Sequence, residues 1–237
     1  MSIKPSVRNH LLASLPDPEM RRLTPSLQPH TWRIREELHQ PGKPLDFVYF
    51  PVSGVASLVT SMEDGTTVEA ATVGNEGLVG LPMFLETGTV SIEAFVQIPG
   101  ECLRMKASIF RAEMQNGGVL REVAQIYTQV LLRFVAQSSA CNRLHSLRQR
   151  CARWLMLSHD RVVGDAFLLT QEFLSQMLGV RRATVTVAAG ELRQLGLITY
   201  RQGRIQIDDR DGLEQAACEC YGVIRREFDR LARFKSK

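Results

Sequence analysis

The spacing of apolar residues changes along the chain and divides the sequence into two parts. From about His30 to Ser108 the apolar residues form short runs rich in aromatic and β-branched side chains, such as FVYFPV (47–52) and GVASLVTS (54–61). Such runs predict short strands. Asp64-Gly65 lies between two of them, which is a strong signal for a β-hairpin. With the later segments TVEAATVG and EAFVQIPGECLRM, the pattern predicts an antiparallel, jelly-roll-like β-roll.

Across residues 120–144 the apolar positions recur every three or four residues, which predicts one long helix. The spacing fits an a/d seam of about three and a half heptads, so we expect the helix to pair with a second copy of the chain. The alternative is a helix that packs on its own domain. Leu131, Leu132 and Val135 widen the apolar face, so one side could contact the roll while the seam meets the second subunit. The residues predicted at the dimer interface are Leu120, Val123, Tyr127, Val130, Phe134 and Cys141.

The remaining sequence predicts a compact second domain. A helical stretch, LHSLRQRCARWLMLSHDRV, is followed by a strand-like AFLLT, two short helices around Gly179, and LITYRQGRIQIDD. Gln202-Gly203 separates two strand-like runs in the last segment, so it predicts a hairpin. Helix, helix and hairpin in this order describe a winged helix-turn-helix. The predicted α+β chain therefore has a β-roll over 1–118, a dimerisation helix and hinge over 119–160, and a winged helix-turn-helix over 161–237.

The two short helices around Gly179 have capping residues at their ends, and the second has one apolar face and one face of short side chains. Thr170 suits the N-cap of the first helix and Gly179 suits the turn. The second helix has an outer face of short side chains with an arginine at either end, which would let it approach a surface closely. Arginine can bind guanine or phosphate there, whereas the alternative is a solvated helix face. The expected buried face is Val185, Ala188 or Ala189, Leu192 and Leu195, before a stop at Gly196, and the outer face is Arg182, Ala183, Thr186, Val187, Gly190 and Arg193.

Charge adds to this interpretation because it is unevenly distributed. Residues 1–118 contain 10 basic and 13 acidic side chains, whereas residues 119–237 contain 19 and 12. A basic C-terminal half favours an anionic partner, with nucleic acid as the first candidate.

Other features restrict the class of protein. No run of 18 apolar residues exists, and the apolar stretch Leu11–Leu15 is too short for a signal peptide core, so we expect a cytoplasmic protein without a membrane span. The five cysteines suit a reducing compartment. Cys218-x-Cys220 is too small for a zinc site by itself, so ordinary thiols and no metal are expected, with redox sensing as the alternative.

The segment TQEFLSQMLGVRRATVTVAAGELRQLGLI (170–198) resembles the DNA-binding domain of the Crp/Fnr family of bacterial transcription regulators. VYFPVSGVASLV and the turn VGNEGLVGLP follow the family's order in the roll. The resemblance implies a homodimer whose second helices read the halves of a palindromic operator about 34 Å apart, with RNA polymerase as a further candidate partner. The matching positions are Thr170, Gln176, Gly179, Arg182, Thr184, Val185, Leu192 and Gly196-Leu197-Ile198.

The resemblance also implies roles for single residues. Arg182 is similar to the family's base-reading arginine. Departures are Ala183 where a glutamate is usual, Val187 where arginine is frequent, and Arg181 in place of a serine cap, which is expected to cost about 1 kcal/mol of capping or to gain a contact with DNA. The predicted DNA-binding residues are Thr170, Ser175, Arg181, Arg182, Thr184, Thr186, Arg201 and Arg204.

The roll lacks the residues that bind cyclic nucleotides in this family, namely a Gly-Glu turn, an Arg-Ser pair and a Thr-Ser pair on the long helix. The matching positions here are Gly80-Leu81, Ile92-Glu93 and Val135-Ala136. We therefore expect no cAMP dependence, and the effector is left open. An iron–sulfur cluster is not expected because the first cysteine is Cys102, and no pattern selects His30 or His39 as a haem ligand.

Two other classes of protein compete with a transcription regulator. A metal-dependent cupin enzyme would need clustered histidine and glutamate ligands in the roll, and no such cluster, P-loop or catalytic triad pattern is present. The basic half could instead bind nucleic acid without sequence preference, or an acidic protein.

Overall fold

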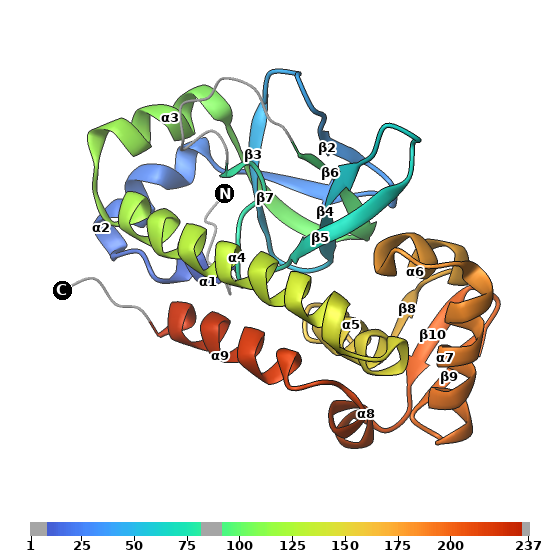
Figure 1. The fold of residues 1–237 in the computed structure, drawn as a ribbon. Helices are drawn as coiled ribbons and strands as arrows, with labels where there is room; N and C mark the ends of the chain where they lie inside the picture. The colour runs from blue at the N-terminus through green and yellow to red at the C-terminus, as the bar shows by residue number, and fades with distance from the viewer. Residues whose placement is uncertain (1–8, 82–91, 234–237) are drawn as a thin grey trace. The chain divides into compact units, whose positions relative to one another are not determined.

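The computed structural model describes residues 9–81 and 92–233 (Figure 1). The chain forms two compact units, one from residues 1–58, 72–132 and 226–237 and the other from residues 59–71 and 133–225. Among the described residues, no helix has the length and apolar character needed to cross a membrane.

The predicted roll is made of antiparallel strands in two sheets. In one sheet β7 (Gly100–Lys106) lies between β1 (Gln28–Trp32) and β3 (Phe47–Pro51). The other has the order β2 (Glu37–His39), β6 (Glu93–Ile98), β4 (Val55–Ser61) and β5 (Thr67–Val73). The Asp64-Gly65 hairpin is confirmed, with Gly65 at φ +81° between β4 and β5.

Short helices that the apolar pattern did not predict accompany the roll: α1 (His10–Ala13), α2 (Asp17–Leu23), η1 (Thr24–Ser26) and α3 (Ala107–Asn116). The core includes Trp32 and Phe50. The rings of Phe50 and of Phe110 in α3 pack edge to face, with their centres 6.3 Å apart. Asn9 is fully buried, and its amide donates to the carbonyl oxygens of Pro51 and Gly77. These bonds satisfy a buried polar group and fix the start of the described chain.

The predicted long helix is α4 (Val119–Leu144), but the side it buries differs from the expectation. Each of the six residues predicted at a dimer interface is at most 6% exposed within the single chain. Side chains that are covered within their own chain offer little surface to a second copy, and their place in a dimer interface stays a prediction. The exposed side of α4 instead carries Leu132, which is 70% exposed, together with Ala136, Ser139 and Ala140. The six buried residues are Leu120, Val123, Tyr127, Val130, Phe134 and Cys141.

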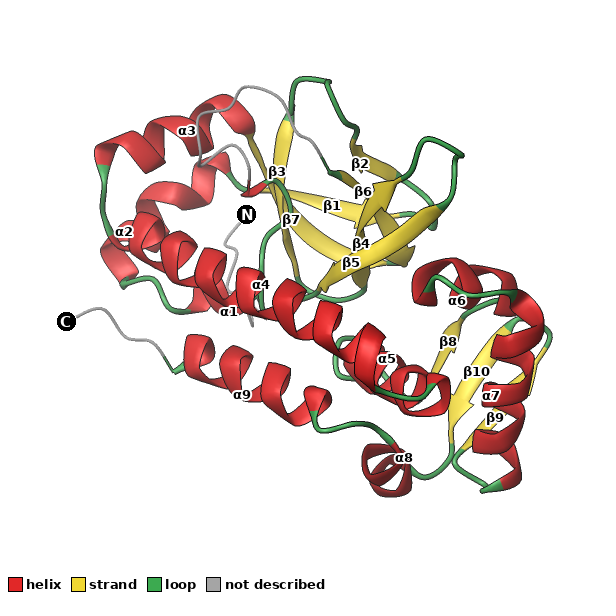
Figure 2. Ribbon diagram, in the orientation of Figure 1, coloured by secondary structure: helices red, strands yellow, loops and turns green. Residues whose placement is uncertain are grey.

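The second unit contains the predicted winged helix-turn-helix (Figure 2). After α5 (Leu147–His159) come β8 (Ala166–Leu168), α6 (Gln171–Leu178), α7 (Arg182–Gln194), β9 (Ile198–Arg201) and β10 (Arg204–Ile207). The strands form an antiparallel sheet in the order β8-β10-β9. Two helices that the sequence analysis did not predict, α8 (Arg210–Ala216) and α9 (Cys220–Ala232), follow the hairpin.

Candidate nucleic-acid interface

The turn between α6 and α7 is built from local signals in the sequence. Thr170 is the N-cap of α6, and its hydroxyl oxygen accepts a hydrogen bond from the Phe173 N–H at 3.1 Å. Gly179 adopts φ +64° after the helix, and the next N–H, of Val180, bonds back to the Ser175 carbonyl at 3.0 Å. This is the Schellman arrangement, which glycine favours because it has no Cβ. The predicted cap and turn are confirmed.

The apolar face of α7 is buried, as predicted, except at its end. Leu195 is 59% exposed, because the helix ends at Gln194 and Gly196 turns the chain with φ +73°. The N–H of Leu197 then bonds to the Leu192 carbonyl at 3.1 Å, which places Leu197 in the core instead. The expectation that Leu195 belongs to the core is therefore wrong. The buried residues of α7 are Val185, Ala188, Ala189 and Leu192.

Part of the basic excess in the C-terminal half is structural rather than available to a partner. Arg150, Arg153 and Arg161 are each at most 9% exposed. The guanidinium of Arg150 donates to the Leu178 carbonyl at 2.6 Å, where it satisfies a free carbonyl at the end of α6. Net charge by sequence therefore overestimates the positive surface of this half.

A second group of arginines is exposed on the helix-turn-helix and its wing. Within the described parts of the chain, none of them forms an ion pair. Arg181 is the N-cap of α7 but makes no capping hydrogen bond, because a guanidinium has no atom that accepts a bond from a backbone N–H. The start of α7 therefore combines free backbone N–H groups, a positive helix dipole and two arginines, which suits an anion. The exposed group is Arg181, Arg182, Arg193, Arg201 and Arg204.

The wing hairpin places two of these arginines opposite each other. Gln202 and Gly203 have φ of +49° and +74°, which are the left-handed values of a two-residue type I′ turn. Arg201 and Arg204 are direct partners across the strands. Like charges at such positions destabilise a hairpin, so their presence suits an interaction with an anion rather than the stability of the wing.

The other predicted DNA contacts divide into accessible and inaccessible residues. Thr170, Thr184 and Thr186 are exposed, and the Thr186 hydroxyl donates to Oε1 of Gln171 at 2.8 Å. Ser175 is only 5% exposed, and its hydroxyl donates to the Glu172 carbonyl at 2.7 Å. Burial and this bond do not favour a phosphate contact by Ser175, and its predicted role stays a prediction.

Part of the roll segment that the resemblance compares with a cyclic-nucleotide site lies in the described residues. Ile92 and Glu93 are partly buried at the start of β6, whereas residues 89–91 of the same segment lie outside the described residues. The guanidinium of Arg104 lies 4.2 Å from the ring centre of Phe47, on neighbouring strands of the other sheet.

An antiparallel roll, a long helix and a winged helix-turn-helix define the class of two-domain DNA-binding regulators. Two family models match the chain, a cyclic nucleotide-binding domain over residues 29–116 and a Crp-like helix-turn-helix domain over residues 149–216. A cyclic nucleotide-binding domain followed by a Crp-like helix-turn-helix domain is the domain composition of a transcription regulator of the Crp/Fnr type rather than of an enzyme.

Named relatives agree with this assignment. The chain is 27% identical over 190 residues to a global nitrogen regulator of Synechococcus elongatus, covering 74% of this chain and 83% of the relative. The fold of this chain is similar to that of a putative Crp/Fnr regulator from Eubacterium rectale, with a TM-score of 0.67 and 15% identity. The match covers 87% of this chain and 96% of the regulator. FixK2 of Bradyrhizobium japonicum has a TM-score of 0.64 at 19% identity, with coverage of 81% and 98%.

One group of residues that the sequence did not reveal comes together in the structure. Cys141 and His145 lie beside Cys218 and Cys220, although more than 70 residues separate the two pairs in the chain. The Cys-x-Cys spacing was the available signal, but it did not identify the other two residues.

Proposed function

We propose that this protein is a homodimeric transcription regulator that binds a palindromic operator and acts without cAMP. The observation that carries the proposal is the group of exposed arginines at the start of α7 and on the wing, which form no ion pair with any residue of 9–81 or 92–233. Exposed arginines around a helix with a face of short side chains suit entry into a major groove.

In this complex the residues of α7 contact bases and phosphates, whereas those of the wing contact phosphates. Arg182 reads a base, since it lies in the first turn of α7 on the exposed side. Arg181, Thr170, Thr184 and Thr186 contact phosphates or bases near the same end of the helix. Arg201 and Arg204 of the wing bind the adjacent phosphates, which fix register but carry no sequence information.

The dimer forms through the exposed side of α4 rather than through its buried seam. Leu132, Val135, Ala136, Ser139 and Ala140 recur at helical spacing along that side, and their short or apolar side chains suit close packing with the same helix of a second copy. Two copies related by a two-fold axis would present two reading helices to the two halves of a palindrome.

Replacing both wing arginines with alanine is expected to weaken binding to operator and to unrelated duplex DNA by a similar factor. Each lost phosphate contact should reduce the slope of log affinity against log salt by about 0.9. Unfolding temperature should not fall, because the substitution removes a repulsive cross-strand pair. Fluorescence anisotropy over a range of salt concentrations checks the slope, and an unchanged slope would remove the wing from the interface.

Addition of cAMP is expected to change neither the operator affinity nor the unfolding temperature. The physical reason is that Glu93 stands where the family places phosphate-binding residues, and no arginine lies between Lys43 and Arg104. Calorimetry with the full-length protein checks this directly. Saturable binding at micromolar cAMP with a rise in operator affinity would contradict the proposal for the roll while leaving DNA binding intact.

A further inference from the structure

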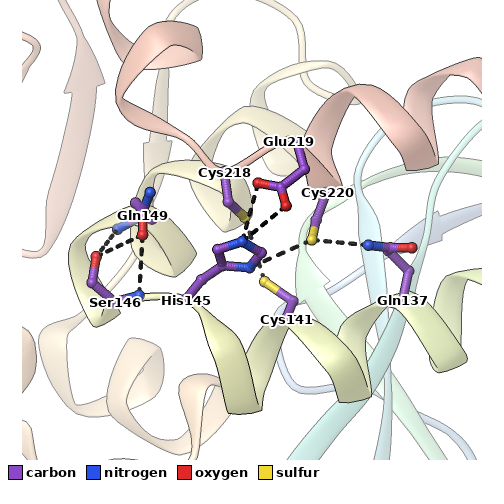
Figure 3. Close-up of polar contacts among 8 residues, drawn as sticks. All are labelled: Gln137, Cys141, His145, Ser146, Gln149, Cys218, Glu219 and Cys220. Carbon is purple, nitrogen blue, oxygen red and sulfur yellow. Dashed lines mark hydrogen bonds and ion pairs between the residues drawn. The ribbon is translucent and has the colours of Figure 1, made fainter.

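Four residues with metal-binding side chains meet in the second unit, where the end of α4 lies beside the segment that joins α8 to α9. Cys141 lies in the last turn of α4 and His145 directly follows that helix, whereas Cys218 lies between α8 and α9 and Cys220 is the first residue of α9. One ligand atom from each residue lies within 4.8 Å of the other three. Figure 3 shows the three sulfur atoms grouped around the ring of His145.

Each pair of ligands is presented by a short local segment. The N–H of His145 bonds to the Cys141 carbonyl at 3.1 Å, so the two residues share one side of a helical turn. Cys218 and Cys220 flank a single residue at the start of α9, and the Tyr221 N–H bonds to the Cys218 carbonyl at 3.0 Å. Two closely spaced ligand pairs from distant parts of a chain are typical of structural zinc sites.

The distances between ligand atoms fit one tetrahedral ion. The Sγ atoms of Cys141 and Cys218 are 3.4 Å apart, and Sγ of Cys220 lies 3.6 Å from Nδ1 of His145. A zinc ion with Zn–S bonds of about 2.3 Å separates its ligand atoms by roughly 3.5–3.8 Å. The two sulfur atoms are too far apart for a disulfide, in which they are about 2.05 Å apart.

Neighbouring side chains orient the ligands as they do around known metal sites. The Nε2 atom of His145 lies 3.0 and 3.1 Å from the two carboxylate oxygens of Glu219. A proton held on Nε2 by this carboxylate leaves the Nδ1 lone pair free to face the sulfur atoms, as in carboxylate–histidine–zinc arrangements. The Gln137 amide donates to Sγ of Cys220 at 3.0 Å, which suits a thiolate.

Burial and charge are also consistent with a metal centre. The three cysteines are at most 4% exposed, and the side chain of His145 is 15% exposed. Three thiolates around a divalent ion leave one negative charge, and the positive charge of Arg153, itself buried, acts on Cys141 and Cys218. Packing of neutral thiols alone would require neither the histidine nor its carboxylate partner.

We propose that Cys141, His145, Cys218 and Cys220 bind one Zn²⁺ in a closed Cys₃His site. With four protein ligands the ion has no open position, so its role is structural. Binding releases the thiol protons and transfers no electron. The ion fastens the end of α4 to the start of α9. The remaining cysteines, Cys102 and Cys151, lie outside the group as buried free thiols.

Metal analysis of the purified full-length protein is expected to find about one zinc per chain, released by a mercurial reagent. Cys141→Ser and Cys220→Ser should each reduce the zinc content at least about tenfold under dialysis. Cys102→Ala and Cys151→Ala are matched controls, because each removes a buried thiol outside the site and should leave the zinc content unchanged. None of these measurements involves DNA, so their failure would be separate from a failure of DNA binding.

A second measurement does not depend on the folding of a variant. Wild-type protein freed of metal is expected to take up one Co²⁺ with the strong visible absorption of a tetrahedral thiolate complex, and Zn²⁺ should displace it. Glu219→Gln should weaken the affinity for Co²⁺ about 10- to 100-fold at unchanged stoichiometry. Substoichiometric zinc after addition of Zn²⁺, absence of the cobalt spectrum, or a Cys141–Cys218 disulfide in the isolated protein would overturn the proposal.

Discussion

Arg182→Ala is expected to remove the preference for the operator over unrelated DNA, with a loss of specific affinity of about 10- to 100-fold. Arg182 is exposed in the first turn of α7 and forms no ion pair within the described residues, so its removal leaves the helix-turn-helix core intact. The lost free energy is that of a bidentate contact with a guanine, which phosphate contacts cannot replace. Gel-shift titration against operator and scrambled duplexes measures both affinities.

The matched control for this experiment is Arg148→Ala. Arg148 carries the same charge, is about half exposed, and lies 3.7 Å from Glu191, away from the start of α7. It should change both affinities by a similar and small factor. If Arg182→Ala left the operator preference unchanged, Arg182 would not be the base-reading residue.

Leu132→Glu is expected to convert the dimer into a monomer and to weaken operator binding by more than tenfold. Leu132 is 70% exposed in the single chain and lies near the middle of α4. A carboxylate there would be buried against its own copy across the two-fold axis, and an unpaired buried charge costs several kcal/mol. Analytical ultracentrifugation measures the mass, and a gel-shift with a full palindrome measures the affinity.

Ile34→Glu is the control, because Ile34 is also a large exposed apolar residue, at 51%, but lies between β1 and β2. This variant should sediment like the wild type. A Leu132→Glu protein that stays dimeric would place the dimer interface elsewhere, and a wild-type monomer at micromolar concentration would exclude the homodimer.

The elements that the sequence predicted correctly are those with local signals. Thr170, Gly179 and the Gln202-Gly203 turn each act through hydrogen bonds or backbone angles within a few residues, so their effect can be read without the rest of the fold. The two short helices and the wing followed from them. Leu195 shows the limit of periodicity, because the apolar spacing included it although the helix ends one residue earlier, at Gln194, and the chain turns at Gly196.

Features that depend on distant residues were not predictable in the same way. The first two N–H groups of α4 donate to the carboxylate of Glu19, about 100 residues earlier, at 3.1 and 3.0 Å. The side of α4 that is buried depends on the surface it meets, so an apolar seam could not distinguish the roll from a second copy. The Cys₃His group was not predicted either, because its two halves are distant in the sequence and come together only in the fold.

Selection of duplex DNA from a random pool by the purified wild-type protein shows whether it reads a palindrome as a homodimer. We expect the enriched sequences to contain two inverted copies of one short motif, with centres about 10–10.5 base pairs apart, because two α7 helices related by a two-fold axis would enter successive major grooves. Pools selected with and without cAMP should converge on the same motif. Absence of enrichment, or convergence on a single motif without inverted symmetry, would contradict a homodimer that reads a palindromic operator.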